Sequence, residues 1–351
     1  MTTAGSDALQ GLRVLEVAEG VAGPMGGKVL RDLGATITRV EPPEGDWLNR
    51  VAPHDGKNAV YAQLNHGKTM RTLDLMTAGA QQELRELVRA CDIIIVGERH
   101  AKLPKLGLTY NALRRENPDL IYCHVTGWGT GGPLGDRPAS ELCIQVVAGL
   151  TRYLGAPGGA PIRQGFDLVS VNTGIAAAQA VLAAWLWRDQ SGEGQFVEVS
   201  MLATAIALMQ WDITAFSGPD EWAGRQLEAH EWPPDHGFQC ADTRCLIDLT
   251  GNTEGWPALL REIGYPELGA DPRFSTPEGI DLHVAELPRL TAERLSAWAF
   301  ADLEQLVRDK YDGTIVPMLS LPDVLAHPQV KHIGIVADAP APHFRFPIET
   351  R

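Results

Sequence analysis

Apolar runs and helical patterns alternate along the first two hundred or so residues of the chain. Short runs rich in Val, Ile and Leu predict strands at 13–17, 36–40, 92–96, 120–125 and 195–199. The segments between them have helical periodicity, at 25–33, 81–89, 110–116, 139–150, 173–188 and 201–216. Because strand, helix and strand recur within about thirty residues, parallel βαβ units are expected. The pattern predicts an α/β fold with a Rossmann-like parallel sheet.

The pattern changes near Ser217. Residues 217–237 are rich in Pro, Trp, His and acidic side chains and read as a linker, and 236–249 predict a hairpin that turns at Asp242-Thr243. Helices dominate from there to Lys310, before a strand at 314–318. We therefore expect a large domain over 1–216, completed by about 320–351, and a linker with a smaller α+β domain over 217–319.

Composition limits the kinds of partner that the chain is expected to bind. The chain has 351 residues, is 44% hydrophobic and carries a formal net charge of -14, which disfavours binding to nucleic acid or to an anionic membrane.

The longest apolar run, 174–187, is too short to span a bilayer and predicts a buried helix. The first ten residues lack the apolar core and basic flank of a signal peptide. The five cysteines are scattered, which indicates reduced thiols in a cytoplasmic protein.

Common nucleotide and metal motifs are missing. Residues 20–27 read GVAGPMGG, whose proline and spacing do not fit the dinucleotide-binding G-x-G-x-x-G. Neither a P-loop nor a G-x-S-x-G elbow occurs. One dense group of His and acid lies at 228–236, but Pro233-Pro234 interrupts it, so an exposed loop is favoured over a metal site. We expect no metal.

Three cations lie where a parallel sheet binds ligands. Arg39, Lys68 and Lys105 lie in or after predicted strands or in βα loops, and such positions meet at one sheet edge. These positions are consistent with a site for an anionic ligand that carries phosphates. They are equally consistent with charges scattered over the surface.

Many short stretches match one family together. They include Ala22-Gly23-Pro24, Val40-Glu41-Pro42-Pro43, Asn65-His-Gly-Lys68, Gly127-Trp128-Gly129, Gly192-Glu-Gly-Gln195, Asp271-Pro-Arg-Phe274 and His327-Pro-Gln329. As a set they resemble the family III CoA-transferases, over nearly the whole chain. The glycine-rich loop that other members carry after the position of Phe216 has no counterpart here.

The resemblance implies a fold, an assembly and a ligand. Members have a Rossmann-like large domain and a small domain, and two chains thread through one another as an interlocked dimer. CoA or acyl-CoA would bind at the βα loops as a substrate. The family positions that contact CoA fall on Ala22, Arg39, Lys68, Lys105 and Trp128. The family's usual Asn-Phe after the predicted strand at 92–96 is missing, and Glu98-Arg99 lies near that place. An acid beside a polyphosphate is unfavourable.

The resemblance also places a serine at the nucleophile position. In the family an aspartate attacks the acyl-CoA thioester, and a mixed anhydride and an enzyme-bound CoA thioester follow. The matching segment is Gly165-Phe-Asp-Leu-Val-Ser170-Val-Asn-Thr-Gly174, with Ser170 in place of the aspartate. A serine hydroxyl is uncharged at neutral pH, and no adjacent base activates it in the sequence.

Two carboxylates near this position are alternative nucleophiles. Asp167 is three residues earlier, and Glu141 lies where members often have an acid beside the site. The structural interpretations are a loop cap for Asp167 and a buried hydrogen-bonding acid for Glu141. Racemisation, which a branch of the family performs, is disfavoured by Ser140 and Val169.

Three hypotheses follow. The chain is a subunit of an acyl-CoA:carboxylate CoA-transferase, in a heterodimer with a related subunit that supplies the aspartate. Alternatively, it is a self-sufficient homodimeric transferase that uses Asp167 or Glu141. The third hypothesis is a non-catalytic or repurposed acyl-CoA-binding protein.

Overall fold

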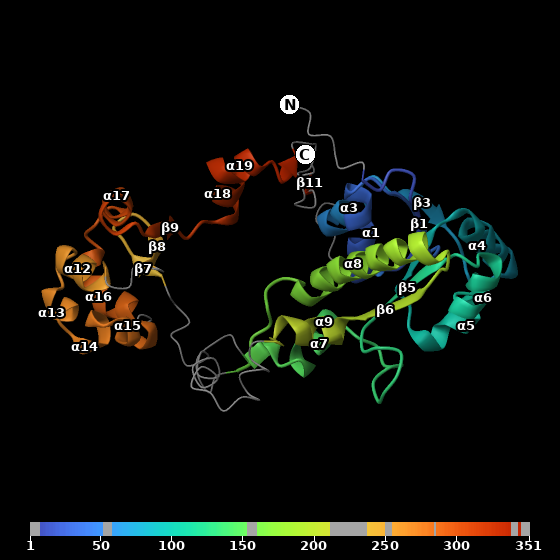
Figure 1. Cartoon of the computed structure of the whole chain (residues 1–351), viewed down its shortest axis with the longest axis horizontal. Helices are drawn as coiled ribbons and strands as arrows, with labels where there is room; N and C mark the ends of the chain where they lie inside the picture. The colour runs from blue at the N-terminus through green and yellow to red at the C-terminus, as the bar shows by residue number, and fades with distance from the viewer. Residues whose placement is uncertain are drawn as a thin grey trace. The chain divides into compact units, whose positions relative to one another are not determined.

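A computed structural model describes residues 8–51, 58–152, 160–210, 237–249, 255–283, 286–337 and 343–344. The chain divides into two compact units (Figure 1). The first comprises residues 1–153, 161–223 and 334–351, and the second 154–160 and 224–333.

A six-stranded parallel sheet forms the centre of the first unit. Its strands are β1 (Arg13–Val17), β2 (Thr36–Glu41), β3 (Thr69–Thr72), β4 (Ile93–Val96), β5 (Ile121–Thr126) and β6 (Phe196–Ser200). Their order is β3-β2-β1-β4-β5-β6, and every pairing is parallel. This is the doubly wound order in which the strand order reverses between β1 and β4, where such sheets bind ligands.

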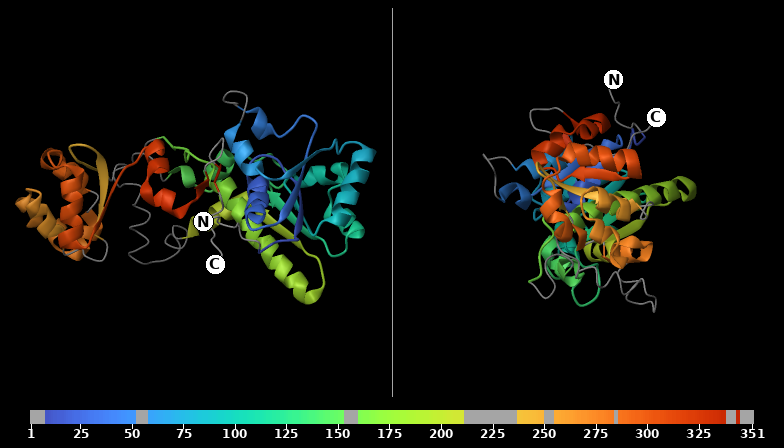
Figure 2. Two further views of the ribbon diagram at one scale, coloured as in Figure 1. Left: turned by 90° about the horizontal axis from the view of Figure 1, so that it is seen from above. Right: turned by 90° about the vertical axis from the view of Figure 1, so that its left-hand side faces the viewer.

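Helices cover both faces of this sheet (Figure 2). On one face α1 (Ala22–Asp32) and α8 (Leu168–Ser191) pack on alternate strand residues such as Val14, Ile93 and Ile121. On the other face lie α4 (Ala78–Ala90), α5 (Leu103–Leu106) and α6 (Tyr110–Glu116), packed with Leu15, Ile94 and Tyr122 among others. A sheet buried on both faces explains the nearly continuous apolar strands.

Shorter elements complete the first unit. They are α2 (Trp47–Arg50), α3 (Ala59–Asn65), η1 (His100–Lys102), α7 (Glu141–Val147), η2 (Leu150–Arg152), α9 (Met201–Leu208) and the pair β10 (Val336–Ala337) and β11 (His343–Phe344).

The second unit has its own core. Strands β7 (Phe238–Gln239), β8 (Arg244–Asp248) and β9 (Thr314–Pro317) form an antiparallel sheet. Around it lie α12 (Gly255–Glu262), α13 (Pro266–Gly269), α14 (Pro272–Ser275), α15 (Pro277–His283), α16 (Leu287–Leu295) and α17 (Phe300–Tyr311). Two short helices, α18 (Leu321–Ala326) and α19 (Pro328–Ile333), follow β9 and have no buried residue. Buried residues including Cys245, Leu259, Phe274 and Leu303 join the sheet to α12, α14 and α17.

The predicted strands are confirmed to within about two residues, and so is the hairpin, in which Cys240 N donates to Thr243 O. The pattern missed β3, whose sequence TMRT is exposed at all four positions because it is the edge strand. Helix α8 begins at Leu168, five residues before the predicted start at Thr173, so Ser170 lies in its first turn. The segment expected to be a linker lies almost wholly outside the described residues, as does the end of the helix expected to reach residue 216.

Helix α8 is also longer than the apolar run that predicted it. The run 174–187 is the middle of a helix of 24 residues, which is long and apolar enough to cross a membrane by length and composition. Here its buried residues, such as Ala177, Ala178 and Val181, pack in the core with α1 and the sheet, as those of a core helix do.

Candidate functional site

A cavity of about 580 Å³ opens at the carboxyl ends of the central strands. Residues from the ends of β1, β2 and β4, the turn after β3 and helix α5 form its wall. The apolar lining includes Val17, Pro42, Trp47, Leu75 and Leu108. The cavity lies at the reversal point of the sheet, where doubly wound folds bind nucleotides.

The polar lining of the cavity is mostly acidic. Two lysines, Lys102 and Lys105, face five acidic side chains, which are Glu19, Glu41, Glu44, Asp74 and Glu98. Lys102 Nζ lies 3.0 Å from Glu98 Oε2. Lys105 is the one predicted CoA contact that lines the cavity, and its ammonium has no carboxylate partner among the described residues.

Partial burial changes the acidity of Glu19 at this wall. It raises the pKa of the Glu19 carboxyl, and the nearby charges of Asp46 and Glu98 add to the effect. A hydrogen bond from Trp47 N to Glu19 Oε2, at 3.3 Å, acts in the opposite direction. Glu19 is not among the residues predicted from the sequence, although it lies only two residues after β1.

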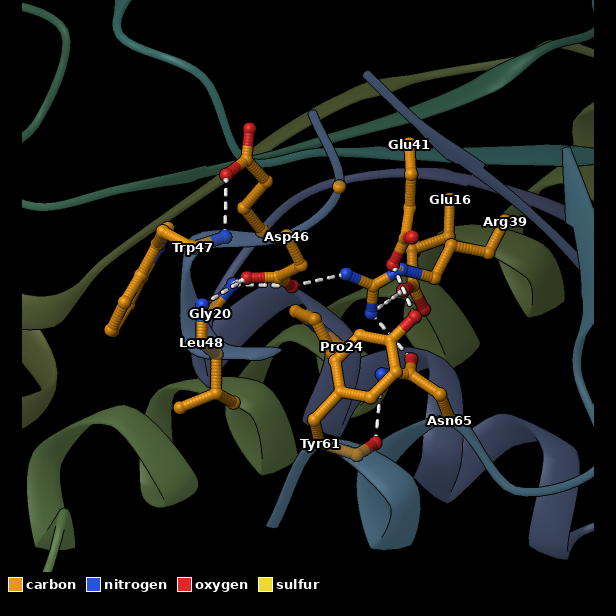
Figure 3. A network of polar contacts seen from close by, with 12 residues as sticks. Glu16, Gly20, Pro24, Arg39, Glu41, Asp46, Trp47, Leu48, Tyr61 and Asn65 are labelled. Carbon is orange, nitrogen blue, oxygen red and sulfur yellow. Dashed lines mark hydrogen bonds and ion pairs between the residues drawn. The ribbon is translucent and has the colours of Figure 1, made fainter. Parts of the chain in front are cut away.

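Behind the cavity, Arg39 is the centre of a buried polar network (Figure 3). Its guanidinium is 3.1 Å from Glu16 Oε1 and 3.0 Å from Glu41 Oε1, and it also pairs with Asp46. The side chain of Arg39 is fully buried. Burial alone would lower the pKa of Arg39, but the three carboxylates outweigh it and raise this pKa.

The network fixes the loop between β1 and α1. Asp46 accepts hydrogen bonds from Gly20 N, at 2.9 and 3.1 Å to its two oxygens, and from Leu48 N at 2.7 Å. The Tyr61 hydroxyl donates to Glu41 Oε1 at 2.8 Å. Burial raises the pKa of Tyr61 to about 12, helped by this bond. The cavity wall is thus held by charge pairs that the solvent does not reach.

Lys68 is also satisfied internally. Its Nζ donates to Glu16 Oε2 at 2.7 Å and to Pro24 O at 2.8 Å, and the side chain is fully buried. Burial lowers the pKa of Lys68, and the Glu16 carboxylate offsets this only in part. The CoA contacts predicted for Arg39 and Lys68 stay predictions; their geometry favours a role in holding the loop.

A second polar centre lies at the start of α8. The Glu141 carboxylate accepts from Val169 N at 2.9 Å, from Ser170 N at 2.8 Å and from Ser170 Oγ at 2.6 Å. Gln145 Nε2 adds a fourth hydrogen bond, at 2.8 Å to Oε1. Glu141 therefore satisfies two N–H groups of the first turn of α8, where the helix dipole favours a negative charge.

The neighbouring acid, Asp167, is in a different environment. It precedes α8 without a side-chain capping bond. Its Oδ1 is 2.9 Å from Arg163 Nη2, and the side chains of Arg163 and Asp167 are 51% and 37% exposed. A carboxylate this open keeps lone pairs for chemistry, whereas those of Glu141 are occupied by four donors.

The remaining predicted contacts, Trp128 and Ala22, belong to other parts of the first unit. Trp128 donates from Nε1 to Pro138 O at 3.2 Å and packs with Ile144 and Val169, near the Glu141 carboxylate. Ala22 is the first residue of α1. Its carbonyl oxygen lies so close to Gly174 that a Cβ added there would be 2.6 Å from it. Neither residue lines the cavity.

No group of three His, Cys, Asp or Glu side chains that could hold a metal ion occurs among the residues that the structure describes. The histidine-rich stretch 228–236 lies outside them.

Known proteins resemble this chain along its length. The family model of CoA-transferase family III matches residues 9–350. A succinate–glutarate CoA-transferase of Agrobacterium fabrum is 31% identical over 345 residues, covering 95% of this chain and 85% of the relative. An acetyl-CoA:oxalate CoA-transferase of Acetobacter aceti is 32% identical over 75% of this chain and 69% of its own length.

Solved structures agree with these relatives. A CAIB/BAIF family protein from Brucella suis has a TM-score of 0.84 and 28% identity, covering 99% of this chain and 93% of its own. The protein Rv3272 of Mycobacterium tuberculosis has a TM-score of 0.83 and 29% identity, covering 98% and 93%.

Proposed function

Because this chain belongs to CoA-transferase family III, whose substrates are CoA thioesters, we propose that it is a subunit of an acyl-CoA:carboxylate CoA-transferase whose partner supplies the nucleophilic aspartate. The observation that carries the proposal is the pairing of Ser170 with Glu141. Ser170 stands at the family's nucleophile position, and its hydroxyl is bonded to a carboxylate that has no free lone-pair direction.

Chemistry at the partner's site would follow the family's double exchange. The aspartate attacks the thioester carbonyl, the carbon–sulfur bond breaks, and a mixed anhydride and free CoA thiolate form. The thiolate then attacks the aspartyl carbonyl of the anhydride and releases the first acid. The second acid then attacks the aspartyl-CoA thioester and releases CoA thiolate, which forms a new mixed anhydride. The thiolate attacks the carbonyl of the second acid in this anhydride, which gives the new acyl-CoA and frees the aspartate. This chain would contribute a nucleotide cavity with Lys105 in its wall.

Exposed apolar side chains near Ser170 support a partner chain. Helices α7 and α9 pack against each other and expose Leu142, Val146, Val147, Ile206 and Leu208, and the segment before α8 exposes Ile162 and Phe166. A group of this kind is typical of a surface that another chain covers. Assembly as a heterodimer with a related subunit, in the interlocked manner of the family, is part of the proposal.

Two preparations test it. Purified alone, the chain should not exchange CoA between succinyl-CoA and a panel of carboxylic acids, as followed by mass spectrometry. Purified with a tag from its native host, it should bring a related subunit that carries the aspartate, and exchange should disappear when that aspartate becomes Asn. Full activity of a strictly homodimeric preparation would contradict the proposal.

A self-sufficient transferase is the second candidate, because Asp167 is open and lacks competing donors other than Arg163 among the described residues. If the chain alone is active, Asp167→Asn should abolish exchange and Glu141→Gln should not. Hydroxylamine trapping followed by peptide mapping would then identify the acylated carboxylate.

A further inference from the structure

Trp47 is the aromatic member of the cavity wall. The residue is 45% exposed, although its indole is among the largest apolar side chains. In the part of the chain that the structure describes, no other aromatic side chain lines this cavity. An exposed indole beside a cavity offers a flat apolar surface on which a ring system of a ligand can stack.

The backbone that carries this indole is fixed by the buried network behind the cavity. Trp47 is the first residue of α2, whose N-cap is the buried Asp46. Asp46 pairs with Arg39 and accepts a hydrogen bond from Gly20 N at 2.9 Å. Trp47 N itself donates to Glu19 Oε2 at 3.3 Å. The position of Trp47 is therefore set before a ligand arrives, which lowers the entropic cost of binding.

The indole rests against the loop that follows β1. A Cβ on Gly20 would come within 2.6 Å of Trp47 Cζ2, 3.0 Å of Cε2 and 3.1 Å of Nε1. Figure 3 shows the ring beside Gly20 and directed away from Arg39. Gly20 also has a φ of 77°, so both its conformation and this contact favour glycine. The loop thus supports the indole, and the exposed part of the ring borders the cavity.

We propose that the adenine ring of CoA stacks on the indole of Trp47. Adenine is the one aromatic ring system in CoA, and Trp47 is the one aromatic side chain among the described residues that line the cavity. The base is uncharged at neutral pH, so the carboxylates in the wall do not repel it. The inference rests on the proposed function, since it takes the cavity as the site of the CoA nucleotide. It assigns Trp47 as a ligand-binding residue.

Calorimetric titration of the full chain with CoA tests the proposal through two substitutions. Trp47→Phe keeps a flat ring and should raise the Kd by no more than about threefold. Trp47→Leu keeps an apolar side chain without a ring and should raise the Kd by about tenfold or more. Because the acyl group is not part of the stack, Trp47→Leu should raise the Kd of succinyl-CoA by the same factor.

A fluorescent ligand gives a readout that does not depend on how well Trp47→Leu folds. The base of 1,N6-etheno-CoA fluoresces, and stacking on an indole quenches this emission. Saturating amounts of the wild-type chain should therefore quench the ligand, and saturating amounts of Trp47→Phe should quench it clearly less. Equal quenching by the two proteins would show that the base does not lie on Trp47.

Trp187→Leu is the matched control. Trp187 is 53% exposed on α8 and does not line the cavity, so its substitution should leave the Kd of CoA unchanged. An unchanged Kd in Trp47→Leu, or equal effects of Trp47→Phe and Trp47→Leu, would overturn the stacking and leave the proposed function standing. Failure of the wild-type chain to bind CoA would overturn the nucleotide cavity of the proposed function together with this inference.

Discussion

The hydroxyl of Ser170 donates to a carboxylate that already accepts two N–H groups from the same helix end. Glu141 therefore supplies the negative charge at the first turn of α8. An aspartate at position 170 would place a second carboxylate against it. Two carboxylates in contact cannot both ionise without a large cost in free energy. The identities of residues 141 and 170 have to be considered together.

Substitutions at Ser170 should reveal this coupling. Ser170→Ala removes one hydrogen bond to a charged group and should cost about 1.5–3 kcal/mol in the free energy of unfolding. Ser170→Asp should cost at least as much at pH 7, because the new charge faces Glu141. Adding Glu141→Gln should relieve the deficit of Ser170→Asp and not that of Ser170→Ala, measured by urea unfolding. Equal responses of the two variants would show that charge repulsion is not the cause.

His124 is a buried histidine whose charge state bears on stability. Its Nε2 donates to Glu98 O, so Nε2 carries the hydrogen, and Nδ1 has no hydrogen-bond partner among the described residues. Burial lowers the pKa of His124 below its ordinary value near 6.5, against the opposing effects of the Glu98 backbone and Glu198. His100, whose ring centroid is 6.2 Å away, lowers it further.

The stability of the chain should therefore fall at acid pH through this residue. Below about pH 6.5 the unfolded chain binds a proton that folded His124 resists, so the free energy of unfolding decreases until pH passes the lowered pKa. One such group contributes a slope of up to about 1.4 kcal/mol per pH unit. His124→Asn, which keeps a donor for Glu98 O, should reduce this slope in urea unfolding measured at a series of pH values below about 6.5. An unchanged slope would mean that other groups cause the acid sensitivity.

At the scale of elements, the contact of α1 with α8 positions both polar centres. The two helices approach closely at Gly26 and Gly174, where a Cβ on Gly174 would come within 2.5 Å of Met25 Cβ and 2.6 Å of Ala22 O. The first of these helices follows the loop that lines the cavity, and the second begins at the Glu141 carboxylate. Small residues at this crossing thus connect the cavity wall to Ser170.

Paired glycine substitutions test the closeness of this contact. Gly174→Ala should cost about 1–3 kcal/mol, because backbone and Met25 have to move. Gly79, in the exposed first turn of α4, has no atom within 4 Å of the position that an added methyl group would take, so Gly79→Ala should stabilise the fold by about 0.4–1 kcal/mol. Thermal unfolding of both variants measures the difference, and a neutral Gly174→Ala would mean that the helices are more loosely packed.

At the scale of the whole molecule, the formal net charge of -14 has to be compared with the charges around the cavity. The cavity carries an excess of acids, and the cations that sequence position suggests for an anion are mostly paired inside. An acidic chain can still bind an anionic cofactor when local cations outweigh local acids. Here Arg39 and Lys102 pair with Glu41 and Glu98, and Arg50 and Arg99 lie beside Glu44 and Glu98 without lining the cavity. The charge around the cavity is therefore less negative than its lining alone suggests.

The linear pattern was sufficient for five strands of the parallel sheet and for the longer helices of the first unit. In the second unit it predicted the hairpin, the strand at 314–318 and a helical region, without its separate helices. Runs such as Ile93–Val96 are apolar because both faces of the strand are covered, and this constraint is visible locally. The edge strand β3 was not predicted, because its four exposed residues show no regular pattern of apolar positions. The early start of α8 was not predicted either. The acid that accepts hydrogen bonds from its first N–H groups is Glu141, which lies 28 and 29 positions before the donors Val169 and Ser170.

The sequence by itself determined the family, the parallel α/β fold and the serine at position 170, since these depend on short-range patterns and on residue identity. Only the tertiary structure decided which charges are available. Arg39 and Lys68 are separated from Glu16 by 23 and 52 positions, yet they form buried pairs with it. Whether a cation meets a ligand or an internal carboxylate depends on distance and burial in three dimensions, and spacing along the chain does not encode either.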